Sequence, residues 1–448
     1  MAKLFGTDGI RGEAGVFPLD EATVFKIGRS LAVRMAERLG RPPRFVTGRD
    51  TRESGGWIES SFSQGAAAGG AGSESAAVIT TPGVAFLAAH FEFDLGIVIS
   101  ASHNPFEDNG IKVFLPSGRK IDDELERGVE ADIAAGNNDH QPGSRLSLND
   151  SRASAFGAAY LAHLRSATGS FRLDGYKIAA DCANGAASEL APALFRGLGA
   201  DVIPFNDRPD GRNINHDCGS LHLEHLQAKV TETGADLGVA FDGDADRALF
   251  VDDTGNVVDG DAALWVMAKL MQGRGELASG KVVATVMSNI GLEIALASRG
   301  IQLVRTAVGD KYVLDELLRS GVEIGGEQSG HIIFPRVSLV GDGMMTALRI
   351  LEAAVLSGKK LSELTEGFRR YPQVLVNVRV GQKKPFDEVE AIRKASTETE
   401  AALSGSGRLL LRYSGTENLA RVMIEGRDQN EIEGLANQLA NTIKAALG

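Results

Sequence analysis

One order of elements recurs three times along this chain, and it constrains the fold more than any other feature. Each copy opens with a short apolar run, a small polar turn and helix-forming residues, in PRFVTGRDTRESG, YKIAADCANGAAS and KVVATVMSNIGLE. A second strand follows, and then a third strand that enters a polar loop and leaves it as another strand. We therefore predict three related α/β domains with mixed sheets.

The order of elements changes after Pro372. A strand is expected there, followed by a helix from Phe386 to Leu403, a strand pair and a final helix. The apolar stripe of that final helix consists of Ile432, Leu435, Leu439 and Ile443. We expect a smaller C-terminal α+β domain. The predicted domains are 1–150, 151–255, 256–368 and 369–448.

The composition excludes several classes of protein. The chain has 448 residues, 43% of them hydrophobic, and the only cysteines are Cys182 and Cys218, so neither a disulfide framework nor a cysteine zinc site is expected. We find no signal peptide and no membrane-spanning run, which predicts a cytoplasmic protein without a membrane partner. A net charge of −12 argues against nucleic acid, and an anionic substrate would need a local basic pocket.

The first polar loop lies within IVISASHNPFEDNGIKVF, from Ile97 to Phe114. A buried apolar run stops at Ser100, and Ser102 then stands at the tip of the strand beside the potential base His103. If the loop is a hairpin-like excursion, Lys112 returns close to Ser102. A serine with a base and a cation nearby is a candidate covalent carrier.

The second polar loop, FDGDADRALF, places alternate carboxylates at Asp242, Asp244 and Asp246. Packed carboxylates repel one another unless a cation neutralises them, and three leave room for a phosphate oxygen beside magnesium. A turn rich in aspartate and glycine is the alternative. A calcium EF-hand does not fit, because Arg247 occupies the glycine position and Asp253 the final glutamate position. A phosphatase D-x-D-x-T motif does not fit either, because Asp246 replaces the threonine.

The third polar loop is GGEQSGH. Glu327 and Ser329 stand between glycines and suit hydrogen bonds to vicinal sugar hydroxyls. His331 suits proton transfer, and a structural histidine is an equally good interpretation. Near the N-terminus, Arg11 lies between glycines in GTDGIRG, where we expect a loop and either a phosphate contact or a surface charge. The same two readings apply to the arginines of GRDTR.

The C-terminal domain contains LRYSGTENLARVM, with an arginine, hydroxyls and a glycine close together. Such groups form an anion cradle, although a hairpin turn also favours Ser-Gly-Thr. The residues of this candidate cradle are Arg412, Ser414, Gly415, Thr416 and Arg421.

Taken in order, GTDGIRG, SASHNP, DGDADR, GEQSGH and RYSGTE resemble the motifs of the α-D-phosphohexomutases, and the resemblance covers essentially the whole chain. KLFGTDGIRG and GEQSGH are most similar to members that act on glucosamine phosphates, with glucose and mannose phosphates as the alternative. The phosphate loop departs from the family pattern R-P-S-G-T-E-P, because Tyr413 and Asn418 replace the two prolines.

The resemblance implies an isomerase that moves a phosphate between C6 and C1 through a phosphoserine and a bisphosphorylated sugar. It implies four domains around a cleft, phosphorylated Ser102 and one Mg²⁺ per chain. The implied catalytic residues are Ser102, Lys112, His331, Arg11 and His103. The implied metal ligands are Ser102, Asp242, Asp244 and Asp246. The implied substrate-binding residues are Glu327, Ser329, Arg412, Ser414, Gly415, Thr416, Arg421 and Arg247. The partner is a small sugar phosphate, a homodimer is considered, and a non-catalytic sugar-phosphate-binding protein is the alternative from another class.

Overall fold

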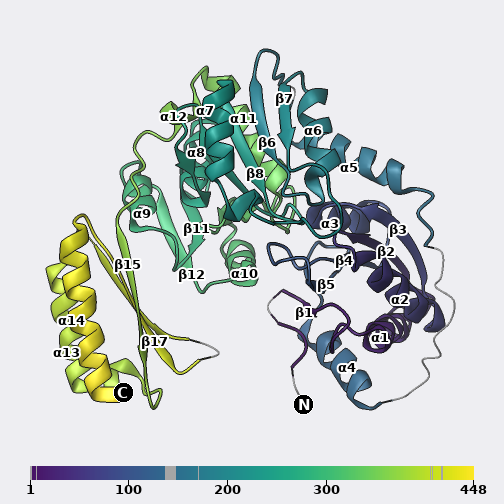
Figure 1. The fold of residues 1–448 in the computed structure, drawn as a ribbon, viewed down its shortest axis with the longest axis horizontal. Coiled ribbons are helices and arrows are strands. Elements are labelled where there is room, and N and C mark those ends of the chain that lie inside the picture. The colour runs from purple at the N-terminus through teal and green to yellow at the C-terminus, as the bar shows by residue number, and fades with distance from the viewer. Residues whose placement is uncertain are drawn as a thin grey trace.

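The computed structural model shows four domains that follow one another along an arc (Figure 1). We call the units built on the four sheets domains I to IV. Domains I, II and III are α/β units with mixed sheets, and domain IV has an antiparallel sheet, so the predicted fold class is confirmed. The described residues are 3–6, 8–136, 148–169, 171–403, 405, 407–414 and 417–448.

Domain I has a sheet of order β1-β5-β4-β2-β3, in which β2, β3 and β4 are parallel and β5 and β1 are antiparallel to their neighbours. Its strands are β1 (Ile10–Glu13), β2 (Arg44–Arg49), β3 (Gly72–Val78), β4 (Leu95–Ile99) and β5 (Asp108–Phe114). Its helices are α1 (Glu21–Leu39), α2 (Gly55–Ala68), α3 (Thr81–His90) and α4 (Asp123–Ala134). The hairpin of β4 and β5 sets Lys112 opposite Val98 and brings it back toward the serine loop.

Domain II repeats this plan in the order β10-β9-β8-β6-β7. Its strands are β6 (Lys177–Asp181), β7 (Asp201–Phe205), β8 (Leu237–Phe241), β9 (Ala248–Asp252) and β10 (Val257–Val258). Its helices are α5 (Ala153–Ala167), α6 (Ala187–Gly197), α7 (Glu224–Thr233) and the 3-10 turn η1 (Gly219–Leu221). The aspartate loop joins the buried strand β8 to its antiparallel neighbour β9.

Domain III has the order β12-β11-β13-β14. Its strands are β11 (Lys281–Thr285), β12 (Gln302–Thr306), β13 (Gly325–Gly326) and β14 (Ile332–Ile333). Its helices are α8 (Gly260–Gly273), α9 (Ile290–Ala297), α10 (Asp310–Ser320), α11 (Gly343–Ser357) and α12 (Leu361–Leu364). Strands β13 and β14, which flank the GEQSGH loop, have two residues each. The loop therefore makes up most of the hairpin in this third copy of the repeat.

Domain IV is a sheet of order β15-β17-β16 covered by two helices. Its elements are β15 (Gln373–Arg379), η2 (Phe386–Glu388), α13 (Glu390–Ala402), β16 (Arg408–Tyr413), β17 (Leu419–Glu425) and α14 (Gln429–Leu447). The prediction of one helix from Phe386 to Leu403 is wrong. Val389 has an extended backbone (φ −99°, ψ 102°) and separates the 3-10 turn from α13.

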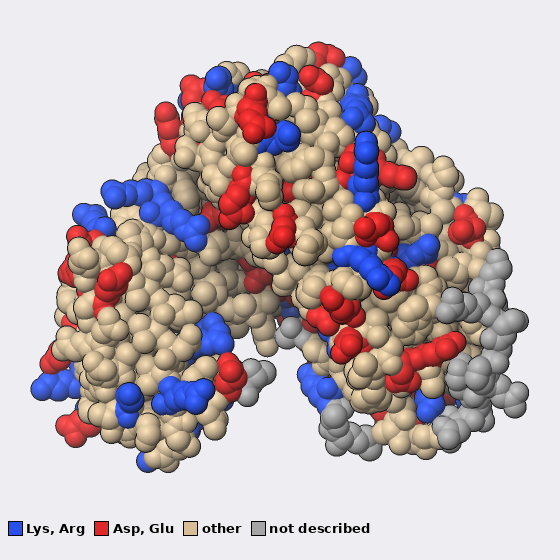
Figure 2. Space-filling view, in the orientation of Figure 1, with Lys and Arg blue, Asp and Glu red and all other residues tan. Residues whose placement is uncertain are grey.

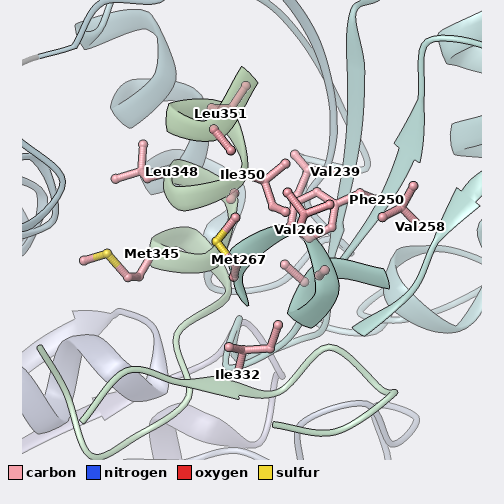
Figure 3. Packing of buried hydrophobic residues seen from close by; sticks show 14 of the residues in the cluster. Val239, Phe250, Val258, Val266, Met267, Ile332, Met345, Leu348, Ile350 and Leu351 are labelled. Atoms are coloured by element: carbon pink, nitrogen blue, oxygen red, sulfur yellow. The ribbon is translucent and has the colours of Figure 1, made fainter. Parts of the chain in front are cut away.

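Domains II and III share one hydrophobic core. In Figure 3, Val266 of α8 and Ile350 of α11 pack against Val239 and Phe250 of the domain II sheet, and Met267 of α8 points toward α11. Domain IV has a separate core. The aspartate loop and the GEQSGH loop therefore belong to one continuous packed unit, whereas domain IV is attached beside it.

The arc leaves an open hollow between domain IV and domain I (Figure 2). The walls of this concave face come from the two ends of the chain (Figures 1 and 2).

Among the described residues, no helix combines the length and the apolar character needed to cross a bilayer.

Helices α1 and α2 cross in domain I through glycines. A Cβ placed on Gly65 would lie 1.9 Å from the carbonyl oxygen of Phe25, and one on Gly28 would lie 2.1 Å from that of Phe62. Both obstacles are helix backbone, which has little freedom to move. The crossing therefore requires glycine on each helix.

We predict that Gly65→Ala destabilises domain I by about 1–3 kcal/mol, because the added methyl group must push the helices apart. Gly56→Ala, in the same helix, is the matched control because its Cβ would meet nothing within 4 Å. Thermal unfolding followed by circular dichroism measures both variants. Equal melting temperatures for the two variants would contradict the close crossing.

Candidate active site

Three polar loops meet at one place in the structure, and each follows the third strand of its repeat. The first contains Ser102 after β4, the second contains Asp242 after β8, and the third contains Glu327 after β13. The carboxyl ends of strands in such sheets are where ligands bind. Ser102 has a left-handed backbone (φ 54°), which turns the chain sharply at the end of β4.

The serine and the aspartates are in direct contact. Ser102 Oγ donates a hydrogen bond to Asp242 Oδ2 at 2.6 Å. One oxygen each of Asp242, Asp244 and Asp246 lie within 4.8 Å of one another, and all three residues are buried. Burial raises the pKa of Asp242 well above its ordinary value, and the neighbouring aspartates raise it further.

These carboxylates fit a divalent cation. Asp244 Oδ1 and Asp246 Oδ1 are buried without a hydrogen-bond partner, although a buried carboxylate oxygen normally has one. Oxygen ligands arranged in this way suit a hard cation such as Mg²⁺. The donor set therefore matches the metal site predicted from the sequence.

Lys112 is the buried cation of this cluster. Its Nζ lies 2.8 Å from Asp244 Oδ2, 3.4 Å from Asp246 Oδ2 and 3.3 Å from Asp8 Oδ2. Burial lowers the pKa of Lys112, but the carboxylates of Asp244, Asp8 and Asp246 outweigh this effect and raise it well above its ordinary value. Lys112 therefore serves here as a fixed positive charge.

Arg11 lies in strand β1, so the expectation of a loop at this position is wrong. Pairing of β1 with β5, with Arg11 opposite Gly110, brings the guanidinium to the serine loop. Its Nη1 donates to the carbonyl oxygen of Ala101 at 3.0 Å, and its Nη2 contacts Asp8. Arg11 is therefore within reach of a group attached to Ser102.

Two histidines border the cluster in different electrostatic surroundings. His331 Nδ1 lies 3.6 Å from Asp246 Oδ1, and this carboxylate overcomes the effect of burial and raises the pKa of His331 to about 9. His103 Nδ1 lies 3.3 Å from Ser102 Oγ and 3.1 Å from Arg247 Nη1. Burial and the nearby arginines lower the pKa of His103 to about 4.

Two side-chain hydrogen bonds hold the GEQSGH loop of domain III in place. Glu327 Oε1 accepts a hydrogen bond from the backbone N–H of Gly309 at 3.2 Å, and Gln328 Nε2 donates to Asp259 Oδ2 at 3.3 Å. Ser329 is half-buried. His331, at the end of this loop, connects it to the aspartates through Asp246.

The candidate anion cradle of domain IV is separate from this cluster. Arg412 of β16 faces Arg421 of β17 in the antiparallel register, and Ser414 is buried beside them. Burial and the neighbouring Arg421 lower the pKa of Arg412. Like charges placed opposite each other destabilise a sheet unless an anion compensates them. The other predicted members, Gly415 and Thr416, lie outside the described residues.

The sequence interpretation missed two residues of the cluster. Asp8 contacts Arg11 and Lys112, and its Oδ1 lies 2.9 Å from Lys120 Nζ. Thr81, at the start of α3, donates its hydroxyl to Asp244 Oδ2 and its backbone N–H to the carbonyl oxygen of Asp244 at 3.0 Å. Asp8 lies within the quoted GTDGIRG motif, whereas Thr81 gave no signal beyond a Thr-Pro helix start.

Comparison with known proteins gives four consecutive matches. Models described as phosphoglucomutase/phosphomannomutase alpha/beta/alpha domains I, II and III match residues 2–140, 158–255 and 259–371, and the model of the C-terminal domain of that family matches 375–442. The phosphoglucosamine mutase of Solibacter usitatus is 50% identical over the full length of both chains. That of Symbiobacterium thermophilum is 45% identical, also over both full lengths.

Solved structures share this fold at lower identity. A phosphoglucomutase/phosphomannomutase family protein from Burkholderia thailandensis aligns with a TM-score of 0.80 at 24% identity, covering 99% of this chain and 97% of its own. An N-acetylphosphoglucosamine mutase of Aspergillus fumigatus, in complex with GlcNAc-6P and magnesium, aligns with a TM-score of 0.67 at 17% identity, covering 99% and 96%. The four consecutive domain matches and the full-length relatives place this chain in the phosphoglucomutase/phosphomannomutase family, the α-D-phosphohexomutases.

Proposed function

We propose that this protein is a phosphoglucosamine mutase that interconverts glucosamine 6-phosphate and glucosamine 1-phosphate. The observation that supports this most directly is the contact of Ser102 Oγ with the buried aspartate cluster, at 2.6 Å from Asp242. The full-length relatives named phosphoglucosamine mutase supply the substrate class. A cytoplasmic location and a homodimeric assembly stay predictions of the sequence.

The reaction would proceed through phosphorylated Ser102. A free hydroxyl of the sugar attacks the phosphorus, a new P–O bond forms to the sugar, and the bond to Ser102 Oγ breaks. The hydroxyl proton passes to a base of the site. Of the two bases predicted from the sequence, Lys112 is held as a cation by the surrounding carboxylates. His331 is the remaining candidate, because a cation bound at Asp246 would weaken the attraction that raises the pKa of His331. Ser102 Oγ takes up a proton as the phosphoryl group leaves and donates to Asp242 Oδ2, as it does in the structure. The resulting bisphosphorylated sugar turns around, and its other phosphate returns to Ser102.

The chain supplies charge stabilisation around this transfer. Asp242, Asp244 and Asp246 would hold Mg²⁺, which neutralises negative charge on the transferring phosphoryl group when it is bound. Arg11 and Lys112 would face the same oxygens, and because they are already fixed by Ala101 and Asp244 they lose little freedom during the reaction.

The remaining predicted residues would hold the sugar in both orientations. Glu327 and Ser329 would bind sugar hydroxyls that lie close to the axis about which the bisphosphorylated sugar turns around. Arg412, Ser414 and Arg421 would bind the phosphate that is not being transferred, and the two opposed guanidinium groups are suited to a dianion. Arg247, which contacts His103, would complete the wall next to the serine.

Ser102→Ala is predicted to abolish mutase turnover, because it removes the oxygen that is proposed to carry the phosphoryl group. The substitution should leave the fold intact, because it removes only one hydroxyl group. A coupled assay measures turnover, and intact mass should show one added phosphate on the wild type and none on the variant. Full mutase activity of Ser102→Ala would exclude the carrier role. A wild type without phosphate would favour the non-catalytic binding protein.

Removal of the metal is predicted to stop transfer reversibly. EDTA should abolish turnover, and added Mg²⁺ should restore it. Asp244→Asn should weaken metal binding by at least about 10- to 100-fold, the loss typical even of an outer-shell partner. Titration with Mn²⁺ followed by electron paramagnetic resonance gives the affinity independently of turnover. Unchanged Mn²⁺ affinity would rule Asp244 out as a ligand.

Substrate preference tests the finer assignment. We predict a higher kcat/KM for glucosamine 6-phosphate than for glucose or mannose phosphates, measured with the same phosphorylated enzyme. Equal values for glucosamine and glucose phosphates would instead support a phosphoglucomutase or phosphomannomutase activity, and the role of Ser102 would be unaffected.

A further inference from the structure

The conformation of the serine loop needs an external support. Ser102 is a non-glycine residue with φ 54°, a region that such residues enter only when their surroundings hold them there. Its side chain is packed against Asp242, and the residue is 1% exposed. The groups that bind the backbone of this loop therefore decide where Ser102 Oγ points.

Arg52 provides the support within domain I. Its Nη2 donates to the carbonyl oxygens of Ser102 at 3.0 Å and Asn104 at 2.9 Å, and its Nη1 donates to that of Pro105. Its Nε donates to Asp50 Oδ2 at 2.9 Å. The guanidinium is fully buried, so it is not the phosphate contact or surface charge that the GRDTR motif allowed. Its planar fork matches several acceptors at once.

Asn215 reaches the same two carbonyl groups from domain II. Its Nδ2 donates to the Ser102 oxygen at 2.9 Å and to the Asn104 oxygen at 3.0 Å. A carbonyl oxygen has two lone pairs, so each can accept from both Arg52 and Asn215. Asn215 itself has φ 58°, which asparagine tolerates better than most residues, and its backbone N–H is bound by Ala183.

Two further contacts tie this support to the site. Ser100 Oγ donates to Asp50 Oδ2 at 2.6 Å and accepts from the backbone N–H of Ser102 at 2.9 Å. A Cβ placed on Gly243, in the aspartate loop, would lie 2.5 Å from the carbonyl oxygen of Ser102. The Ser102 carbonyl is therefore the point where domain I and domain II fix each other's loops.

We propose that Arg52 and Asn215 are positioning residues that hold Ser102 Oγ against the aspartate cluster by binding the loop carbonyls from two domains. This inference rests on the proposed carrier role of Ser102. Both side chains act through the backbone of the loop, so their loss should misdirect the transferred group more than it weakens sugar binding. A misplacement of about 1 Å is enough to cost on the order of 100-fold in rate.

The test compares Asn215→Ala with Asn213→Ala. Asn213 lies in the same loop, but its side chain binds the backbone of that loop, at Arg208 and Asp210. Both variants and the wild type are primed with glucose 1,6-bisphosphate, and intact mass confirms equal phosphorylation. We expect kcat of Asn215→Ala to fall about 10- to 100-fold with KM and melting temperature near wild type, and Asn213→Ala to keep wild-type kcat.

Arg52→Lys is the second variant, because it keeps a cation beside Asp50 and removes the fork. It should lower kcat in the same way and shift the ³¹P resonance of the Ser102 phosphate. Wild-type kcat in Asn215→Ala, or parallel losses of kcat and melting temperature in both asparagine variants, would overturn the positioning role. A wild type without turnover would instead count against the proposed function, and this inference would fall with it.

Discussion

The buried negative charge of Asp242, Asp244 and Asp246 is the constraint on which the rest of the structure depends. Three carboxylates out of contact with water repel one another and lose hydration, so cations must accompany them. Lys112 enters on the β4–β5 hairpin of domain I, and a metal ion suits Asp244 Oδ1 and Asp246 Oδ1, the two carboxylate oxygens without a hydrogen-bond partner. The ion pair that neutralises the aspartates therefore also holds domains I and II together.

Much of the architecture was predictable because it is encoded locally. The alternation of strand and helix patterns gave three α/β units and a different fourth one, and each polar loop follows its third strand in the structure. Two details escaped because they depend on partners distant in sequence. Arg11 belongs to a strand only because β5 offers it an edge, and the 386–403 segment breaks at Val389, which packs against the hydrophobic core of domain IV.

The residues of the site also fall into two groups, those that a local motif indicates and those that depend on partners distant in sequence. Ser102, the aspartates and Lys112 belong to short motifs whose residue types indicate a nucleophile, a metal site and a cation. The fold brings these residues into contact. Thr81 and Asn215 were missed because a threonine at a helix start and an asparagine in a loop are common in any chain. Their importance comes from what they touch, across 163 and 113 residues respectively.

The separation of the two charged regions has a chemical consequence. Arg412 and Arg421 form a positive pair on domain IV, in a chain whose net charge is −12, and the carboxylate of Glu417 lies 4.0 Å from Arg421. The aspartate loop follows β8 of domain II, which lies apart from domain IV in Figure 1. In the proposed reaction, the phosphate of the substrate would be drawn toward this guanidinium pair, which would leave the free hydroxyl of the sugar toward Ser102. After transfer, the sugar would carry two phosphates, whereas the site offers one guanidinium pair. Return of the second phosphate to Ser102 would therefore require the sugar to turn around, and the open hollow leaves room for that movement (Figure 2).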